Sequence, residues 1–453
     1  MLSAIINDGK KQPGGTVLIV AMWIVLILAG LVLVFGRAMR VELGASANHV
    51  AGLQAEAVAQ GTLQFVLSQV DGTQGAYTPD VSVTCHAVQV GDGFFWILNP
   101  SLDDDTAYHF GIRDEASRIN LNSASTDVLL KLPGMTAELA ASIVDWRDGD
   151  SDVTPGGAES EYYLLLADPY YCKNAPFETV EELVLVKGAS PQLLFGEDTN
   201  RNGILDPNEN DGSDSDPPDN RDGHLDRGVF DYLTVYSTEP NVSSSGEAKV
   251  NVNDGNVQAL SALLRDVVGE DKFFQVMDRV RGGRPFSSVL DFYFRTGLTD
   301  AEFGQIADQL TTSGGQNVVG MVNVNTAPRQ VLLCLPGLDE SDVDALVARR
   351  QASGTDLTSV AWVAGVLSRE KALAVGPLIT TRSYQFSADI VAVSGNGRGF
   401  RRYQAVVDAT ASPPRVLYWK DLTHAGWPLA PETLGALRAG TSTAAGLVST
   451  GGL

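Results

Sequence analysis

Thr16–Gly36 reads TVLIVAMWIVLILAGLVLVFG, a run of 21 consecutive uncharged and mostly apolar residues. An α-helix rises about 1.5 Å per residue, so a run of this length can cross the hydrocarbon core of a bilayer. The run contains no carboxylate, and the first acidic residue after it is Glu42. We therefore expect a single transmembrane helix over residues 16–36, which anchors the polar, acidic remainder of the chain to a membrane.

The residues that flank this run leave its processing open. A secretory signal peptide has a shorter apolar core and an Ala-x-Ala-like cleavage site, whereas here Arg37 and Arg40 follow the run directly. A plain single-pass anchor is the alternative. Lys10 and Lys11 on one side balance the two arginines on the other, so the charge bias barely orients the helix.

The composition limits the classes of function. The chain has 453 residues, enough for two or three domains, and a formal net charge of −23. This charge disfavours a nucleic-acid partner, because phosphate binding depends on lysine and arginine, and it suits the binding of cations. The chain is also no disulfide scaffold, since it has only three cysteines, Cys85, Cys172 and Cys334.

The pattern along the chain predicts an α+β fold. Helical spacing continues from Ala45 to about Val70, and runs typical of strands lie on both sides of a long helical region. The predicted strands are Val81–Thr84, Phe94–Leu98, Tyr108–Ile112, Tyr384–Ser394, Phe400–Ala409 and Arg415–Lys420. The economical interpretation is one antiparallel sheet domain, formed by residues 37–112 and 382–425, that is split by an all-α insertion at 113–381. The last segment, 426–453, is predicted to be a disordered tail.

The insertion contains an internal repeat. The motif Asn-x-Asn occurs at 120–122, 251–253 and 323–325, and a helical stretch follows each copy. In the first and third copies this stretch ends in Leu-Pro-Gly, at 132–134 and 335–337, before a second helix, an order typical of helix-hairpin-helix (SAM-like) repeats. The middle copy lacks Leu-Pro-Gly and is degenerate or a different element. We expect the asparagines to cap helices, because their side chains accept hydrogen bonds from free N–H groups.

The hairpins argue against DNA binding. DNA-binding helix-hairpin-helix modules hold a phosphate with hairpin amides and a nearby basic residue. The second hairpin instead places Asp339, Glu340 and Asp342 at a helix N-terminus, where they stabilise the helix dipole and repel phosphate. A membrane-anchored DNA-binding protein is therefore an unfavoured alternative, and we expect no nucleic-acid partner.

The loop at 198–209 carries the sharpest chemical signal. Oxygen-bearing side chains occupy its positions 1, 3, 5 and 9, glycine stands at position 6, and glutamate closes the loop at position 12. This is the calcium-loop pattern of the EF-hand, in which position 7 contributes a backbone carbonyl. The expected calcium ligands are Asp198, Asn200, Asn202, Ile204 through its carbonyl, Asp206 and Glu209. Because every ligand is a hard oxygen, calcium is preferred over zinc, and its expected role is structural.

A second, weaker half-loop follows, so that the calcium-binding region spans residues 198–226. Its candidate ligands are Asn220, Asp222 and Asp226, whereas Pro218 and Val229 stand where the first and last ligands would be. A solvated acidic linker is the alternative interpretation, because Ser, Asp and Pro dominate this segment.

The sequence gives no sign of catalysis. It has no glycine-rich phosphate loop followed by lysine, no His-Glu-x-x-His and no Gly-x-Ser-x-Gly, and its five histidines are scattered. We therefore expect no enzymatic activity and no catalytic residues.

Four of these features together resemble the minor pseudopilins of the K class (GspK) of type II secretion systems. The features are the leader that ends at Gly15, the split strand domain, the Asn-x-Asn/Leu-Pro-Gly insertion and the Asp198–Glu209 loop. The resemblance covers nearly the whole chain. It implies a pilin-like fold, bound calcium, and a complex with the I and J class minor pseudopilins at the tip of a pseudopilus, next to the major pseudopilin. Such a subunit helps initiate assembly and protein export across the outer membrane.

The resemblance also implies how the N-terminus is processed. The prepilin peptidase would remove residues 1–15, cleaving after Gly15, and the new N-terminal residue Thr16 would be methylated; cleavage after Gly14 is the alternative. Most pilins have glutamate at the fifth mature position, where it pairs with a neighbour. Here that residue is Val20, or Ile19 after the alternative cleavage, as is typical of a K-class subunit with no subunit above it.

The resemblance further places the anchor in the inner membrane and the C-terminal body in the periplasm. The alternative function is a minor pilin of a type IV pilus or of a DNA-uptake system.

Overall fold

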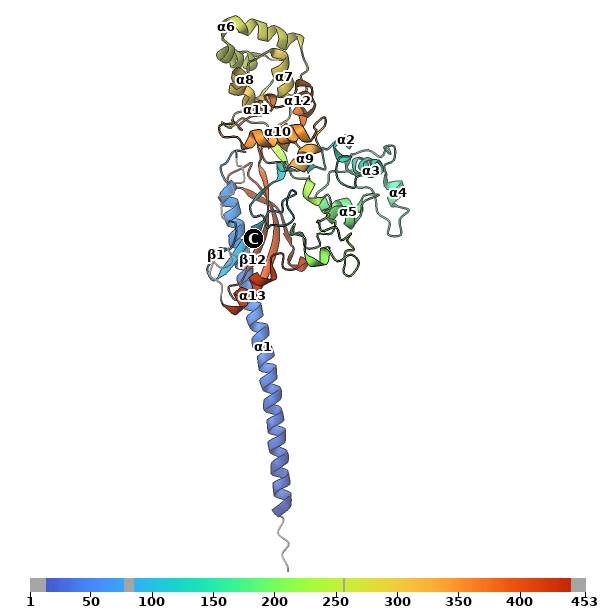
Figure 1. Cartoon of the computed structure of the whole chain (residues 1–453), viewed down its shortest axis with the longest axis vertical. Helices are drawn as coiled ribbons and strands as arrows, with labels where there is room; N and C mark the ends of the chain where they lie inside the picture. The colour runs from blue at the N-terminus through green and yellow to red at the C-terminus, as the bar shows by residue number, and fades with distance from the viewer. Residues whose placement is uncertain (1–13, 77–84, 256, 441–453) are drawn as a thin grey trace, which may run out of the picture.

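The computed structural model describes residues 14–76, 85–255 and 257–440 (Figure 1). One long helix, α1 (Gly14–Val70), extends from the body as a rod. The part of the insertion from 250 to 380 lies toward the opposite end of the molecule, and the part from 126 to 232 lies at the side of the body. The predicted membrane segment and the predicted helix after it are thus one continuous helix. In the described residues it is the one helix long and apolar enough to cross a membrane, and its apolar window is exposed.

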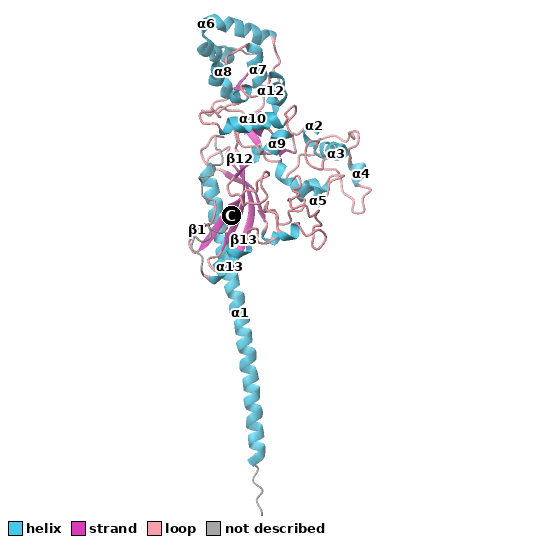
Figure 2. Ribbon diagram, in the orientation of Figure 1, coloured by secondary structure: helices cyan, strands magenta, loops and turns pink. Residues whose placement is uncertain are grey.

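The body contains the predicted antiparallel sheet, and its strands come from both sides of the insertion. The strand order is β1-β2-β12-β13-β14, and β3 also pairs with β12. The strands of this sheet are β1 (Val88–Val90), β2 (Gly93–Leu98), β3 (Arg113–Asp114), β12 (Gln385–Val393), β13 (Phe400–Asp408) and β14 (Arg415–Asp421). The α+β class is therefore confirmed. Figure 2 shows the sheet beside the C-terminal part of α1.

Both faces of the sheet are covered, which explains why all six residues of β2 are buried. Phe95 and Ile97 point to the face that packs against Val58, Leu63 and Val66 of α1. Because side chains alternate along a strand, the other residues of β2 face the opposite side. The apolar residues at that face are Phe94, Trp96, Leu98, Val391, Val393, Leu429 and Leu437.

The prediction of a disordered tail from residue 426 is wrong for the part that the structure describes. Helix α13 (Pro431–Ala439) lies over the second face of the sheet, with Leu437 buried and Leu434 packed beside it. Proline at its first turn and Gly440 in the left-handed conformation mark its two ends. Residues 441–453 lie outside the described residues.

One predicted strand is reduced to a single bridge. Tyr108–Ile112 forms only one bridge, between Leu98 and Phe110, because the strand proper comes later as β3. Val81–Thr84 lies outside the described residues.

The insertion is not all-α, and this part of the prediction is also wrong. It divides into three units, each of which begins and ends with two-residue strands that pair in parallel. Unit A (119–234) is closed by β4 (Ile119–Asn120) and β5 (Leu233–Thr234), unit B (250–311) by β7 (Val250–Asn251) and β8 (Leu310–Thr311), and unit C (322–380) by β10 (Val322–Asn323) and β11 (Ile379–Thr380). A further pair, β6 (Thr238–Pro240) and β9 (Asn317–Val319), is antiparallel and lies between units.

Short helices fill the space between the paired strands, and three-residue 3-10 helices precede the closing strands. Unit A contains α2 (Thr126–Leu129), α3 (Ala137–Arg147), α4 (Ser160–Tyr163), η2 (Val180–Leu185), α5 (Pro191–Phe195), η3 (Pro207–Glu209) and η4 (Phe230–Tyr232). Unit B contains α6 (Gln258–Gly282), α7 (Val289–Thr296), α8 (Asp300–Ile306) and η5 (Ala307–Gln309). Unit C contains α9 (Arg329–Leu333), α10 (Glu340–Gln351), α11 (Ala361–Ala364), α12 (Arg369–Val375) and η6 (Gly376–Leu378). Outside the units, η1 (Glu115–Ser117) follows β3 and η7 (Thr423–Ala425) follows β14.

The repeated asparagines do not cap helices. Asn122 donates to the carbonyl of Phe177 at 3.0 Å and accepts from its N–H at 2.7 Å. Asn253 makes the same pair of bonds with Phe286, and Asn325 donates to the carbonyl of Leu357. The expected capping is wrong: serine or threonine hydroxyls cap α2, α3 and α7, while each asparagine ties its strand to the segment before a later helix of its unit, η2, α7 or α11.

Unit B has the same arrangement as units A and C although it lacks Leu-Pro-Gly. Gly134 and Gly337, the glycines of that motif, have φ of 65° and 76°. In unit B the long α6 bends at Gly269, whose φ is 71°. Glycine adopts positive φ at little cost, so each unit makes its turn at a glycine.

Candidate metal centre

The loop at 198–209 folds back on itself around its first residue. Asp198 Oδ1 accepts from the Asn202 N–H at 3.0 Å, and Oδ2 accepts from the Gly203 N–H at 2.9 Å. Gly203 has φ of 74°, and a Cβ there would lie 2.5 Å from Pro100. The tight turn therefore requires glycine at position 6.

The last ligand position closes the loop. Glu209 Oε1 accepts from the Thr199 N–H at 3.0 Å, and Oε2 accepts from the Asp206 N–H at 3.1 Å. Glu209 is thus brought to the beginning of the loop, beside Asp198, although eleven positions separate them in the sequence. Both side chains are buried.

The electrostatics of this site call for a cation. Burial raises the pKa of Asp198 to about 7, and the charges of Glu209 and Asp231 add to the shift. Burial likewise raises the pKa of Glu209. Among the ion pairs of the described residues, none includes either carboxylate. A pair of buried, mutually repelling carboxylates is costly unless a positive charge lies between them.

The remaining predicted ligands converge on one point. The amides of Asn200 and Asn202 both point at Asp206 Oδ2, at 2.6 and 3.1 Å. Ile204 at position 7 lies in the same turn, with its N–H bound to Asn202 Oδ1 at 2.7 Å. An all-oxygen set gathered in this way fits calcium, which would be held by the six residues predicted from the sequence and would neutralise their charge.

The half-loop repeats this arrangement with one ligand from elsewhere. Asn220 Nδ2 lies 3.1 Å from Asp222 Oδ2 and 3.0 Å from Asp226 Oδ2. The two oxygens of Glu197 accept from the N–H groups of Asn220 and Asp226, at 3.3 and 3.2 Å. Glu209 accepts from the N–H groups of Thr199 and Asp206 in the first loop, and Asp206 corresponds to Asp226, so Glu197 can take the place of the missing twelfth ligand. Glu197 was not predictable from the motif because it lies ahead of both loops.

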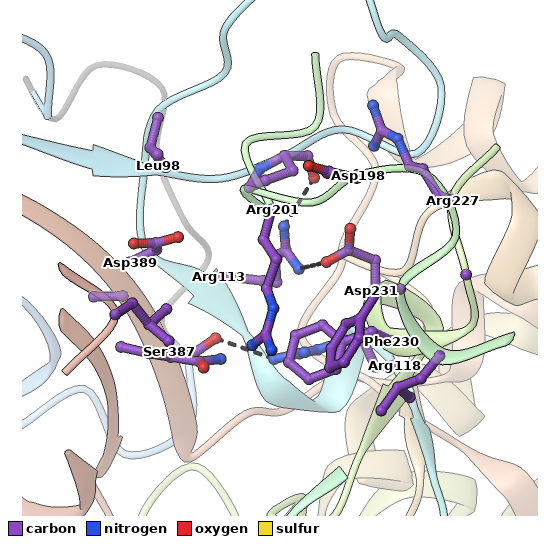
Figure 3. Close-up of a pocket in the computed structure, with 17 residues that line it drawn as sticks. Leu98, Arg113, Arg118, Asp198, Arg201, Arg227, Phe230, Asp231, Ser387 and Asp389 are labelled. Atoms are coloured by element: carbon purple, nitrogen blue, oxygen red, sulfur yellow. Dashed lines mark hydrogen bonds and ion pairs between the residues drawn. The ribbon is translucent and has the colours of Figure 1, made fainter. Parts of the chain in front are cut away.

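Arginine side chains join the first loop to the sheet. The buried Arg402 of β13 pairs with Asp389 of β12 at 2.5 Å and donates to the carbonyl of Arg201 at 2.9 Å and to that of Asn200. Figure 3 shows the pocket beside this contact, where Asp198 and Arg201 lie near Asp389. The loop backbone is therefore held against the two central strands.

A second ion pair closes the other side of the same pocket. Arg113 of β3 contacts Asp231 at 2.7 Å (Figure 3). Burial alone would raise the pKa of Asp231, but the charge of Arg113 holds it below its ordinary value. Arg113 thus neutralises the charge of Asp231, whereas Asp198 has no ion-pair partner among the described residues.

The residues predicted for processing lie at the start of α1. Both Gly15 and Thr16 are in its first turn. No interaction there bears on cleavage or methylation, which stay predictions.

The family comparisons match two parts of the insertion. Residues 115–195 match a model described as "Type II secretion system (T2SS), protein K" (first domain), and residues 322–375 match a second model with the same description. These segments cover most of the helical frame of units A and C. No curated protein sequence matches the chain.

A solved structure is also similar. It is a chain in the crystal structure of the GspK-GspI-GspJ complex of the enterotoxigenic Escherichia coli Type 2 Secretion System, with 13% identity over 85% of this chain and 99% of that one. The TM-score is 0.38, too low for the similarity to support an argument. The similarity to the type II secretion system protein K family therefore rests on the two sequence models, one in unit A and one in unit C.

Proposed function

We propose that this protein is a minor pseudopilin at the tip of a type II secretion pseudopilus, where it helps initiate assembly and export across the outer membrane. The observation that carries the proposal is the match of two separate segments to protein K of that system. It is a structural subunit in this proposal and has no enzymatic role.

The shape of the molecule supports a terminal position. Units B and C lie at the end of the body that is remote from the free part of α1, whereas unit A lies beside the sheet (Figure 1). A subunit stacked above would have to displace units B and C. The apolar Val20 agrees with this position, because a carboxylate at the fifth mature residue would have no partner at the end of a filament.

The anchor supports the proposed location. In the proposal, α1 holds the protein in the inner membrane with its body in the periplasm until assembly, after the prepilin peptidase has cut behind Gly15 and Thr16 has been methylated. The side chains of α1 from Thr16 to Val50 are nearly all exposed. They are free to pack against lipid first and against the helices of other pseudopilins afterwards.

The soluble part of α1 offers a surface for such partners. Ala51, Ala55 and Ala59 are fully buried against the sheet. Val50 and Leu53, on the opposite side, are 50% and 57% exposed. We propose that this stripe packs against the helix of a neighbouring pseudopilin, with the I and J class minor pseudopilins as the partners.

The proposal is tested by mixing the protein with matching I and J class proteins. A stable complex is expected in size-exclusion chromatography with light scattering. Leu53→Glu should weaken it strongly, because it places a charge in an apolar helix contact. Gln54→Glu, which changes an exposed neighbouring residue, is the matched control and should leave the complex intact.

Two outcomes would contradict the proposal. If all three proteins stay monomeric, the tip assignment fails. If Gln54→Glu weakens the complex as much as Leu53→Glu, the stripe is not the contact. Mass spectrometry of protein co-expressed with its peptidase tests processing separately, with N-methylated Thr16 as the expected N-terminus and an intact leader as the contrary result.

A further inference from the structure

A third group of acids lies in unit A, outside the calcium region predicted from the sequence. It belongs to the loop that connects α3 to α4. One carboxylate oxygen each from Asp148, Asp150 and Glu159 lies within 4.8 Å of the other two. Three like charges this close repel one another strongly unless a cation or protons neutralise them.

Glu159 is buried in this group without a partner. Its side chain is only 3% exposed, and neither of its carboxylate oxygens has a hydrogen-bond partner. Asp148 Oδ1 is also buried and unpartnered. Buried polar atoms are almost always bonded, and an unpaired buried carboxylate costs several kcal/mol. The two side chains are therefore arranged for a ligand that carries positive charge.

The surrounding charges do not provide that compensation. Asp145, fully buried beside the group, adds negative charge. Arg147 donates to the carbonyls of Leu121 and Ala124, and Lys187 donates to those of Gly156 and Gly157. No ion pair of the described residues joins either basic side chain to the three carboxylates. Burial raises the pKa of Asp148 and of Glu159, and the nearby charge of Arg147 offsets only part of this for Asp148.

The spacing of these residues is that of a calcium loop. If Asp148 is position 1, then Asp150 is position 3, Asp152 is position 5 and Glu159 is position 12. Val153 takes the place of the usual glycine at position 6, which hides the pattern in the sequence. The backbone turns instead at Gly156, with φ of 91°, and the Thr154 N–H bonds to Asp145 Oδ1 at 3.1 Å.

A second unpartnered acceptor lies beside the loop. The side chain of Asn174 donates to the carbonyl of Asp150 through Nδ2, while its Oδ1 is buried without a partner. The thiol of Cys172 is also near Glu159, but burial raises its pKa to about 11, so it stays protonated and is no thiolate ligand. The available ligands are hard oxygens, which favour calcium over zinc.

We propose that Asp148, Asp150 and Glu159 bind a calcium ion at a site separate from the loops at 198–226. Glu159 supplies the buried ligand, and Asp150, which is exposed, lies at the opening toward solvent. The ion joins the end of α3 to the start of α4.

Counting bound calcium tests the proposal. The full-length chain in detergent is stripped with a chelator, dialysed against buffered calcium and analysed by elemental mass spectrometry. Glu159→Gln keeps the size of the side chain and removes its charge, and it should bind one calcium ion fewer than the wild type. Glu161→Gln, an exposed acid on α4, is the matched control and should lose none.

Two further variants control for misfolding and for overlap with the calcium site of the 198–209 loop. Asp150→Asn changes an exposed residue, so it should fold normally and still lower calcium affinity by at least about tenfold, since a direct ligand matters no less than its outer-shell partners. In a chain that already carries Asp198→Ala and Glu209→Ala, Glu159→Gln should remove one additional ion. Equal calcium content in the wild type and Glu159→Gln would overturn the proposal and leave Glu159 as a buried neutral acid.

Discussion

Units A and C share one frame but differ in what is added to it. In each, an Asn-x-Asn strand pairs in parallel with a closing Leu-Thr or Ile-Thr strand. In each, an arginine at the end of the second helix donates to one carbonyl within that motif and one just after it: Arg147 to Leu121 and Ala124, and Arg350 to Val324 and Ala327. The same contacts therefore stabilise the frame in both units, so the segments that unit A adds to the frame must be stabilised by other interactions.

The additions to unit A are acidic loops. In unit C only nine residues separate α10 (ending at Gln351) from α11 (beginning at Ala361), and η6 follows α12 directly. In unit A, residues 148–179 and 196–229 occupy these two connections and carry all three candidate calcium loops. The candidate cation sites thus lie in the additions, and we expect the frame to fold without cations.

The first asparagine of the motif shows a second difference. In unit A, Asn120 donates to the side chain of Ser237 at 3.0 Å. In unit C, Asn323 donates to the corresponding Ser383 at 2.8 Å and also to Asp114 at 3.1 Å. The first asparagine thus bonds to a buried carboxylate in unit C, whereas in unit A it bonds only to Ser237.

The largest expected difference between units A and C is their response to the removal of calcium. Each ion that binds only the folded state stabilises it by about 2.7 kcal/mol when calcium is at 100 times Kd, and unit A has up to three sites. Hydrogen exchange of the full-length chain should show lost protection in α5 and the 198–209 loop after chelation. Helices α10 and α12 of unit C should keep theirs.

The double variant Asp198→Ala with Glu209→Ala is the control for chelation. In saturating calcium it should reproduce the loss of protection around the 198–209 loop. Equal loss of protection in units A and C would show that the ions do not act on the additions alone.

Acidity should act on the Asn323 junction of unit C and spare the corresponding Asn120 junction of unit A. Burial raises the pKa of Asp114 from 3.8 to about 6, so the folded state keeps a proton that the unfolded chain has lost. The free energy of unfolding then falls as pH rises from about 4 to about 6, and the contribution of this proton is fully present only below about pH 4. Two pKa units correspond to about 3 kcal/mol.

The measurement is denaturant unfolding of the wild type and Asp114→Asn at a series of pH values. The difference in unfolding free energy between them should change over this pH range, whereas Ser237→Ala, at the Asn120 junction of unit A, should give a difference independent of pH. A constant difference for Asp114→Asn would mean that its carboxyl does not titrate there.

Loss of the second asparagine should cost both units the same amount. Asn122→Ala and Asn325→Ala each leave buried backbone groups unbonded, at about 1–3 kcal/mol. Thermal unfolding should register both losses, with Gln54→Ala on the surface of α1 as a neutral control. A loss of stability for only one of the two variants would show that the hydrogen bonds of the second asparagine are not part of the shared frame.

The smallest effect is expected at the hairpin of unit C. Lys371 bridges Asp339 at 2.7 Å and also contacts Asp342, at the N-terminus of α10. Exposed ion pairs of this kind contribute little and are screened by salt. Lys371→Ala should therefore lower the melting temperature slightly at low salt and not at 1 M NaCl; an effect that persists in high salt would point to packing by the lysine stem.

The elements that were predictable from the sequence are those with a long pattern. The strands β2, β12, β13 and β14 were found within one or two residues, because each has a continuous apolar or alternating run. The closing strands β5, β8 and β11 were missed, since two residues such as Leu233-Thr234 have no period to detect. Their partner strands are distant in sequence, so only the folded chain brings them together.

The candidate calcium loops show the same limit of prediction from sequence. The loop at 198–209 is recognisable because glycine at position 6 completes its pattern. The loop at 148–159 has acids at four of the same positions, but Val153 removes that signal, and the burial of Glu159 is a property of the folded protein. Asparagine capping was predicted from local chemistry, whereas the actual partner of Asn122 is 55 residues away.

The pairing of β3 with β12 brings the two ends of the insertion together. Asp114 and Arg113, at the start of the insertion, lie opposite Phe386 and Ser387, just after its end. An unfolded insertion would make this a contact between distant chain segments, which are slow to find each other. Once units A, B and C have formed, the same two segments are held near each other and β12 can join β2 as a nearly local step. On that route we expect the insertion to act as the nucleus for the sheet that packs on α1.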